Sequence, residues 1–337
     1  MQERPRTRRR VRADTERSAH GHAVTLPAHR HPKGVREVFH AGELEIQRRA
    51  GVSEDAAAVG GIIGSAISPA AARFLARQRL AVASTVDPQG RVWASLIAGP
   101  LGFLGAEPGL VRIARLPPPG DPLLDNLAGG GPLGLLVIDP RTRQRMRFNG
   151  NAVRVPGGID LRVAQAYGNC PKYIQLRDAE HDEPTEAAEP VVTRALGEPQ
   201  RRWIANADTF FIASLHPEAG ADASHRGGMP GFVTVNAPTR LSFPDYPGNA
   251  MFNTLGNLAV NPKAGLLFVD FTSGDVLQLT GRARVEADFS VVFDVDEARE
   301  TPAASPLRYR LLEYSPVSPR HARAQRGIQS REREDET

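Results

Sequence analysis

The sequence contains an internal repeat, and this repeat limits the possible folds more than any other feature. Residues 134–139 read Gly-Leu-Leu-Val-Ile-Asp, and residues 265–270, which lie 131 positions later, read Gly-Leu-Leu-Phe-Val-Asp. Further pairs keep nearly the same spacing: Gly150 with Gly281, Asn126 with Asn257, Ala83 with Ala213, and Gly102 with Gly231. A spacing maintained over this length indicates two copies of one structural unit. We therefore predict two related units, covering residues 70–155 and 198–290.

The residue pattern within each copy predicts a mainly antiparallel β fold. In the second copy apolar and polar residues alternate, which is typical of a half-buried strand. The apolar residues are Leu277, Leu279, Ala283 and Val285, and the polar residues are Gln278, Thr280, Arg282 and Arg284. In the first copy, Ser68 and Pro69 mark the start of a helix, and residues 80–86 and 92–98 predict a hairpin. Short helices are expected between Phe39 and Ile63. The predicted fold class is mainly β with helices (α+β).

Length and cysteine content set further bounds. With 337 residues, of which 41% are hydrophobic, the chain fits two domains of ordinary size. No segment approaches the roughly 20 apolar residues that a membrane-spanning helix needs. The single cysteine, Cys170, excludes an intrachain disulfide and is expected to be a small buried residue. We therefore expect a cytoplasmic protein that holds no metal.

The positive charge is concentrated at the N-terminus. Residues 1–36 hold ten Lys or Arg against three Asp or Glu, so the net charge of +4 leaves −3 for the rest of the chain. This composition predicts a disordered basic leader, and a nucleic-acid-binding domain is not expected. The predicted organisation is the leader (1–36), N-terminal helices with the first unit (37–177), a linker rich in charge and proline (178–199), the second unit (200–315) and a flexible tail (316–337).

A polar stretch in the second copy is the strongest candidate for a binding site. Arg226 is followed by Gly227 and Gly228, so a guanidinium and exposed backbone N–H groups can approach one phosphate. A helix that begins near Asn249 would add the positive end of its dipole. The corresponding first-copy residues, 95–99, are mainly apolar, which predicts one working site and one structural copy. The motifs of dinucleotide-binding, phosphoryl-transfer and α/β-hydrolase enzymes are absent from the sequence.

The repeated segments resemble the FMN-binding split-barrel proteins related to pyridoxamine 5'-phosphate oxidases. The similar strings are residues 169–174, 209–214, 224–228 with 230–232, 253–257 with 261–262, and 265–270. The resemblance covers most of the chain from Phe39 to Val285. It implies two tandem FMN-binding split β-barrels, each with six strands. It also implies that FMN lies in a cleft where two barrels meet, either within the chain or in a homodimer.

The resemblance also assigns cofactor-binding residues. The residues implied at the phosphate are Ser224, His225 and Arg226, with the N–H groups of Gly227 and Gly228 beside it and a second segment that begins at Asp245. The residues implied along the ribityl chain or the ring are Tyr246, Asn249, Asn253 and Thr254. The Ser-Arg-Lys run of the oxidases is replaced here by residues 248–251, Gly-Asn-Ala-Met, and no Arg-x-His motif lies near the C-terminus. Oxidation of a vitamin B6 phosphate is therefore not expected.

The function predicted from the sequence is an FMN-dependent oxidoreductase that transfers hydride through flavin N5 to or from a small-molecule substrate. Because the chain has no nucleotide-binding fold of its own, the expected electron donor is a nicotinamide cofactor or a separate reductase. Two alternatives stay open. One is a non-catalytic protein that binds a flavin, haem or another planar ligand. The other is an interaction module whose basic leader binds anionic partners.

Overall fold

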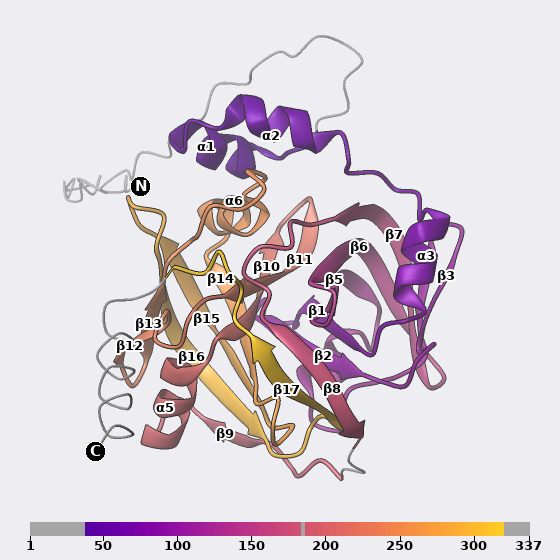
Figure 1. Cartoon of the computed structure of the whole chain (residues 1–337), viewed down its shortest axis with the longest axis vertical. Helices are drawn as coiled ribbons and strands as arrows, with labels where there is room; N and C mark the ends of the chain where they lie inside the picture. Colours follow the sequence, from indigo (N-terminus) through magenta and orange to yellow (C-terminus); the bar gives the residue numbers. More distant parts are fainter. Residues whose placement is uncertain (1–37, 183–185, 320–337) are drawn as a thin grey trace, which may run out of the picture. The chain divides into compact units, whose positions relative to one another are not determined.

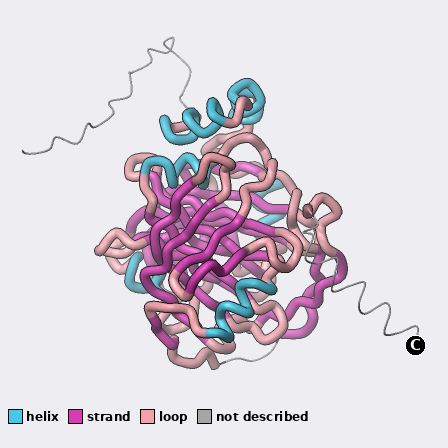
Figure 2. Tube along the Cα trace, turned by 90° about the vertical axis from the view of Figure 1, so that its left-hand side faces the viewer, coloured by secondary structure: helices cyan, strands magenta, loops and turns pink. Residues whose placement is uncertain are grey.

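The computed structural model describes residues 38–182 and 186–319, and these residues are mainly β with helices, as predicted (Figure 1). Strands run through the middle of the described chain and helices lie around them (Figure 2). The predicted leader, residues 1–36, and most of the predicted tail lie outside the described residues. None of the helices in the described ranges is long and apolar enough to cross a membrane.

The first half of the chain forms a seven-stranded antiparallel sheet in the order β2-β1-β5-β6-β7-β4-β3. Its strands are β1 (Leu80–Val86), β2 (Val92–Ala98), β3 (Leu104–Glu107), β4 (Leu110–Ile113), β5 (Gly131–Asp139), β6 (Gln144–Val155) and β7 (Gly158–Gly168). Helix α3 (Pro69–Leu75) precedes the β1–β2 hairpin, and its N-cap Ser68 accepts a hydrogen bond from the Ala71 N–H. The predicted helix start and hairpin are therefore confirmed.

The second half forms a sheet with the same strand order, β11-β10-β14-β15-β16-β13-β12, to which β9 (Val191–Thr193) is added beside β16. Its strands are β10 (Thr209–His216), β11 (Gly220–Gly227), β12 (Thr234–Ala237), β13 (Arg240–Phe243), β14 (Lys263–Val269), β15 (Val276–Val285) and β16 (Val291–Thr301). Each repeat thus extends beyond its predicted end and includes β7 or β16.

The remaining helices are α1 (Ala41–Arg49), α2 (Ser53–Gly60), α4 (Pro122–Asn126), α5 (Glu198–Asn206) and α6 (Asn253–Val260). Helix α1 packs on α6, as Figure 1 shows. The backbones of the two helices approach closely at Gly256, where an added Cβ would lie 2.7 Å from Glu43 Cα. Helix α1 is therefore packed on the second half of the chain, against the helix that borders the candidate site.

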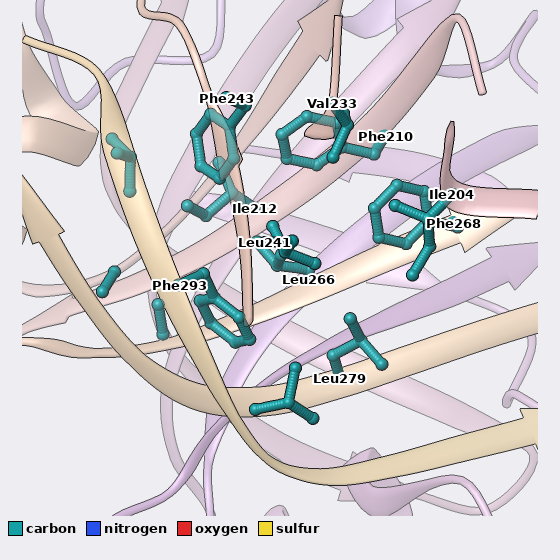
Figure 3. Close-up of a cluster of buried hydrophobic side chains, with 14 of the residues drawn as sticks. Ile204, Phe210, Ile212, Val233, Leu241, Phe243, Leu266, Phe268, Leu279 and Phe293 are labelled. Atoms are coloured by element: carbon teal, nitrogen blue, oxygen red, sulfur yellow. The ribbon is translucent and has the colours of Figure 1, made fainter. Parts of the chain in front are cut away.

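Each sheet encloses its own apolar core, and a third core joins the two halves. The core of the second half, which includes Phe210, Phe268 and Phe293, is shown in Figure 3. The third core packs side chains of the first half, such as Val82, against side chains of the second, such as Phe211. The two halves therefore share a buried interface and fold against each other.

The first part of the polar face of β15, Gln278 and Thr280, is buried in this interface, whereas Arg282 and Arg284 are exposed. Gln278 is 2% exposed and Thr280 is 1% exposed, although the alternation of residues predicts a half-buried strand with these side chains on its open face. The prediction is wrong there because the first half covers that face. Gln278 Nε2 donates to Ala94 O at 2.9 Å, and Thr280 Oγ1 donates to Val92 O at 2.8 Å, so both polar groups keep hydrogen-bond partners.

Two equivalent glycines bring the halves into backbone contact. A Cβ added at Gly134 of β5 would lie 2.6 Å from Ala221 O, and one added at Gly265 of β14 would lie 2.7 Å from Val92 O. Gly134 and Gly265 are the first residues of the repeated six-residue segments. The repeated glycine is thus required by the interface, where each half presses the same strand against the hairpin of the other.

The segment predicted as a linker, residues 178–199, is in fact largely structured. It contains most of β8 (Leu176–Asp182), all of β9 and the start of α5. Strand β8 pairs antiparallel with β17 (Leu307–Glu313), which lies 131 residues later, so the repeat includes these two strands as well. The predicted tail also begins with an ordered part, since Ser318 is 9% exposed. Composition misled the linker prediction because edge strands tolerate charged and proline residues.

Replacing Gly134 or Gly265 with alanine should destabilise the protein by about 1–3 kcal/mol, because the added methyl group meets main-chain atoms that cannot rotate away. The free energy of unfolding from urea denaturation checks this. Gly105→Ala is the matched control, since Gly105 also lies in a strand and an added Cβ there has no atom within 4 Å. If the free energy of unfolding is the same for all three variants, the main chain at the interface shifts at little energetic cost.

Candidate anion-binding site

Two adjoining cavities lie where β6 of the first half meets β11 of the second. Each has a volume of about 70 Å³. Arg147, Arg226, Asp245 and Tyr246 line both cavities. Nine of the ten residues assigned to the cofactor from the sequence line at least one of them: Ser224, His225, Arg226, Gly227, Asp245, Tyr246, Asn249, Asn253 and Thr254. The structure therefore brings the predicted site residues together.

Three arginines meet at the first cavity. Arg145 and Arg147 come from β6, and Arg226 comes from β11. Burial, together with the charges of Arg147 and Arg226, lowers the pKa of Arg145 to about 9. Positive groups that crowd one another in this way favour a bound anion.

His225 is neutral in this arrangement. Its Nδ1 lies 2.9 Å from Arg145 Nη1, and because a guanidinium can only donate, Nδ1 accepts the hydrogen bond. Burial and the charges of the neighbouring arginines, led by Arg145, hold the pKa of His225 well below its ordinary value. His225 therefore positions Arg145 and adds no positive charge for an anion.

Arg147 connects the two halves through a hydrogen-bond network. Its Nε donates to Ala223 O at 3.0 Å and lies 3.3 Å from Asp222 Oδ1, and its Nη1 donates to Asn253 Oδ1 at 2.6 Å. Its Nη2 donates to the Ser224 hydroxyl, which also accepts a hydrogen bond from Thr254 Oγ1 at 2.8 Å. The predicted residues Ser224, Asn253 and Thr254 are thus held in place by a side chain from the other half.

Two buried donors at the first cavity have no hydrogen-bond partner among the described residues. They are Arg226 Nε and Asn169 Nδ2. Arg226 forms an ion pair with Asp245 at 3.2 Å between Nη2 and Oδ1, and burial raises the pKa of Asp245. A buried donor without a hydrogen bond lowers the stability of the folded protein. These two N–H groups therefore indicate a position for a hydrogen-bond acceptor of a ligand.

The loop before α6 closes the second cavity in a strained conformation. Ala250 and Phe252 have φ values of 61° and 57°, in the left-handed region that non-glycine residues rarely adopt. Helix α6 begins at Asn253, four residues after the predicted start near Asn249, because Asn249 is held in the loop by a hydrogen bond from its Nδ2 to Asn169 Oδ1. Residues 253–255 line the second cavity with the first turn of the helix, whose N–H groups favour an anion.

Two predicted features differ in the structure. The Gly228 N–H is not available to a phosphate, because it donates to Asp208 O at 3.0 Å, and Gly228 lines neither cavity. Cys170 is only half-buried and lines the first cavity, where its carbonyl accepts a hydrogen bond from Arg145 Nε at 2.9 Å. Gly227 is required by packing, because a Cβ there would collide with Tyr173 O.

Helix α1 adds a carboxyl group at the edge of the site. Glu43 Oε1 accepts a hydrogen bond from Asn253 Nδ2 at 2.5 Å, and Glu43 Oε2 accepts one from the His40 N–H at 2.9 Å. Burial raises the pKa of Glu43 to about 7 in spite of these hydrogen bonds, and burial lowers the pKa of His40 to about 4. Through Asn253, Glu43 is thus one step from Arg147. Residues 38–182 and 186–319 hold no group of three or more His, Cys, Asp or Glu side chains suited to a metal ion.

The first-half side of the site was not predicted from the sequence. Arg145, Arg147, Asn169 and Tyr173 all line the first cavity, and none was assigned to the cofactor. Together with the second-half residues they define an anion-binding site at the junction of two sheets of the same topology. A site of this class is built from both copies of the repeat, and neither copy contains it alone.

Residues 196–315 match the family model described as pyridoxamine 5'-phosphate oxidase. This part of the chain is therefore pyridoxamine 5'-phosphate oxidase-like, which confirms the resemblance seen in the sequence. No curated protein matches the chain.

Solved structures with partial similarity include HupZ from Group A Streptococcus (13% identity, 30% of this chain and 90% of that chain, TM-score 0.24). They also include an FAD binding protein from Mycobacterium smegmatis (17% identity, 33% and 98%, TM-score 0.23) and an F420 reductase (10% identity, 30% and 95%, TM-score 0.22). Likeness at this level carries no conclusion about function.

Glu43 should make stability depend on pH. Its pKa in the folded state is about 7, against an ordinary value of 4.5, so the folded state holds the proton more tightly than the unfolded state does. Its stabilising contribution is therefore full below pH 4.5 and is lost as the pH rises through 7. We expect wild type to lose about 3 kcal/mol relative to Glu43→Gln over this interval.

Urea denaturation at a series of pH values measures this difference. Glu45→Gln, on the solvent-exposed part of the same helix, is the control and should follow the wild-type pH profile. Parallel profiles for wild type and Glu43→Gln would show that the Glu43 carboxyl is not held in a protonated state by burial.

Proposed function

We propose that the chain is an FMN-dependent oxidoreductase whose two repeated units are split barrels, with the flavin phosphate bound between Arg145, Arg147 and Arg226. The observation that carries the proposal is the convergence of three arginines on a cavity lined by the residues of the matched segment. The family match makes a flavin the preferred phosphate-bearing ligand.

The residues at the cavity fit a phosphate. Arg226 Nε and Asn169 Nδ2 are buried donors that lack a partner in the described chain, and phosphate oxygens are acceptors for both. The first turn of α6 adds N–H groups at the adjoining cavity. Asp245 is the acidic residue among the described residues that line the two cavities, and its ion pair with Arg226 would be loosened when a phosphate binds.

The volume of each cavity is large enough for only part of the ligand. A volume of about 70 Å³ is several times the roughly 10–15 Å³ that one water needs, but it is below the roughly 300–1,000 Å³ of common ligand pockets. The phosphate fits in this conformation, whereas the ring system requires the loop of residues 244–252 to move outward. The left-handed residues Ala250 and Phe252 make that loop the natural place for such a movement.

A bound flavin supplies hydride transfer at its N5 atom, so the protein needs no nucleophilic side chain. The work left to this chain is to hold the phosphate with its arginines and to orient the rest of the ligand against Tyr246 and Asn249. Electrons would come from a nicotinamide cofactor or a separate reductase. The substrate is a small molecule that reaches the ring when the loop is open.

Arg226→Ala should weaken FMN binding about ten- to a hundredfold, because a charged hydrogen-bond donor to the phosphate is lost. Riboflavin, which lacks the phosphate, should bind both proteins equally. Asp245→Asn should bind FMN several times more tightly than wild type, because the competing carboxylate is removed. Titration followed by flavin absorbance and fluorescence measures all three affinities.

Arg240→Ala is the matched control, because Arg240 is exposed on β13, where it pairs with Asp294. If Arg226→Ala binds FMN as wild type does, the phosphate is not held by Arg226. If no flavin binds at all, the flavin assignment is lost. A third outcome is that flavin binds but is reduced by neither NADH nor NADPH, nor in an assay coupled to a reductase. That outcome would favour the non-catalytic binding protein over the enzyme.

A further inference from the structure

A larger cavity is lined mainly by the first half of the chain. Its volume is about 700 Å³, ten times that of either cavity at the anion site. Its walls come mainly from the end of β2, from residues 115–119 and from residues 304–306. This volume is within the roughly 300–1,000 Å³ typical of pockets for small organic ligands.

The large cavity is the counterpart of the anion site in the other copy of the repeat. Strand pairing shows the equivalence: Phe210 pairs with Arg226 in the second half, and Leu80, 130 positions before Phe210, pairs with Ala98 in the first. Ala98 lines the large cavity as Arg226 lines the anion site. The repeat therefore places one cavity on each side of the interface between the halves.

The groups that bind an anion in one copy are absent from the other. Ala98 stands in place of Arg226, and Ile97, which pairs with Ala81, stands in place of His225. Arg147 is replaced by Gln278, 131 positions later, and Gln278 donates its hydrogen bonds to Ala94, Ser95 and Asp121. A phosphate held as at Arg226 is therefore not supported in the large cavity.

The walls of the large cavity suit an apolar body. Leu96, Ala98 and Leu116 line it, together with Pro100, Pro306 and the consecutive prolines 117–119. Proline walls are rigid, so little conformational entropy is lost when a ligand packs against them. Such a surface favours the hydrocarbon or aromatic part of a ligand.

The charges at the cavity suit an anionic end. Among the described residues that line the cavity, Arg79 and Arg115 are basic and Glu186 is acidic. Arg115 is exposed, and its Cγ would lie 3.0 Å from a Cβ on Gly99, so its stem runs along the cavity wall. Within the described residues Arg115 has no ion-pair partner, which leaves its charge for a ligand.

We propose that this cavity binds a small amphipathic organic anion, with its apolar body against the proline wall and its carboxylate or sulfonate at Arg115. The site is distinct from the anion site, and its occupation does not depend on flavin binding. The chain would then carry two different ligand sites at the two equivalent positions of its repeat.

The test uses two fluorescent probes with nearly the same aromatic body. 8-Anilinonaphthalene-1-sulfonate carries a negative charge, and N-phenyl-1-naphthylamine carries none. Folded wild-type protein should bind the sulfonate at one saturable site. Arg115→Glu should weaken sulfonate binding about tenfold, because an attraction becomes a repulsion, and should leave the neutral probe within about twofold.

Ala98→Trp should block both probes by filling the cavity, and Arg202→Glu, an exposed reversal on α5, should affect neither. Binding should persist in Arg226→Ala and in the presence of excess FMN, which separates this proposal from the flavin assignment. The thermal midpoint of each variant checks that it is folded, and the result for Arg115→Glu stands even if Ala98→Trp does not fold.

Three results would overturn the proposal. One is the absence of saturable sulfonate binding. Another is equal sulfonate affinity in wild type and Arg115→Glu, or displacement of the probe by FMN. The third is binding that appears only after residues 1–36 are deleted, because the leader would then be the occupant of the cavity.

Discussion

The close contact between the two halves is the constraint on which the rest of the structure depends. Gly134 and Gly265 let each central strand press against the hairpin of the other half, with added Cβ atoms at 2.6–2.7 Å from opposing main-chain oxygens. This contact aligns β6 with β11, so that Arg147 reaches Ala223 O. The reciprocal pattern is that of an isologous two-fold interface, here made within one chain. The antiparallel pairing of the equivalent strands β8 and β17 has the same origin.

Local sequence signals predicted the elements well, because each depends on a few neighbouring residues. The helix start at Ser68 and the hairpin over residues 80–98 follow from capping and alternation within one segment. The sequence could not show which faces the other half covers. Gln278 and Thr280 are polar residues of the kind found on a solvent-facing side, yet the first half covers both of them. Their burial is tolerated because the main-chain oxygens of Ala94 and Val92 accept their hydrogen bonds. From the sequence, polar residues are predicted to be exposed unless their long-range hydrogen-bond partners are known.

The same limit explains which part of the anion site could be predicted. Arg226 and the α6 residues belong to the matched segment, so the resemblance located them. Arg145 and Arg147 lie 81 and 79 positions earlier in the chain, in the copy judged structural. One signal was present: these two charged residues share one face of a strand whose other face carries Met146 and Phe148. A pair of arginines on the interface face of a repeated strand indicates a charge that the other copy, or a ligand, must balance.

The chain also differs from a symmetric dimer in what its two equivalent positions hold. In a homodimer both sites have the same residues, so any change alters both. Two halves of one chain are free of that restriction. Here the first half has Ala98 at a large cavity, where the second half has Arg226 at two small ones. Gln278 of the second half donates a hydrogen bond to Asp121 of the first half at 3.0 Å. The equivalent position in the first half holds Arg147, which donates to Ser224 and Asn253 of the second half. The equivalent glycines Gly134 and Gly265 keep the close contact on both sides of the interface, whereas the residues that line the two positions differ in charge and size.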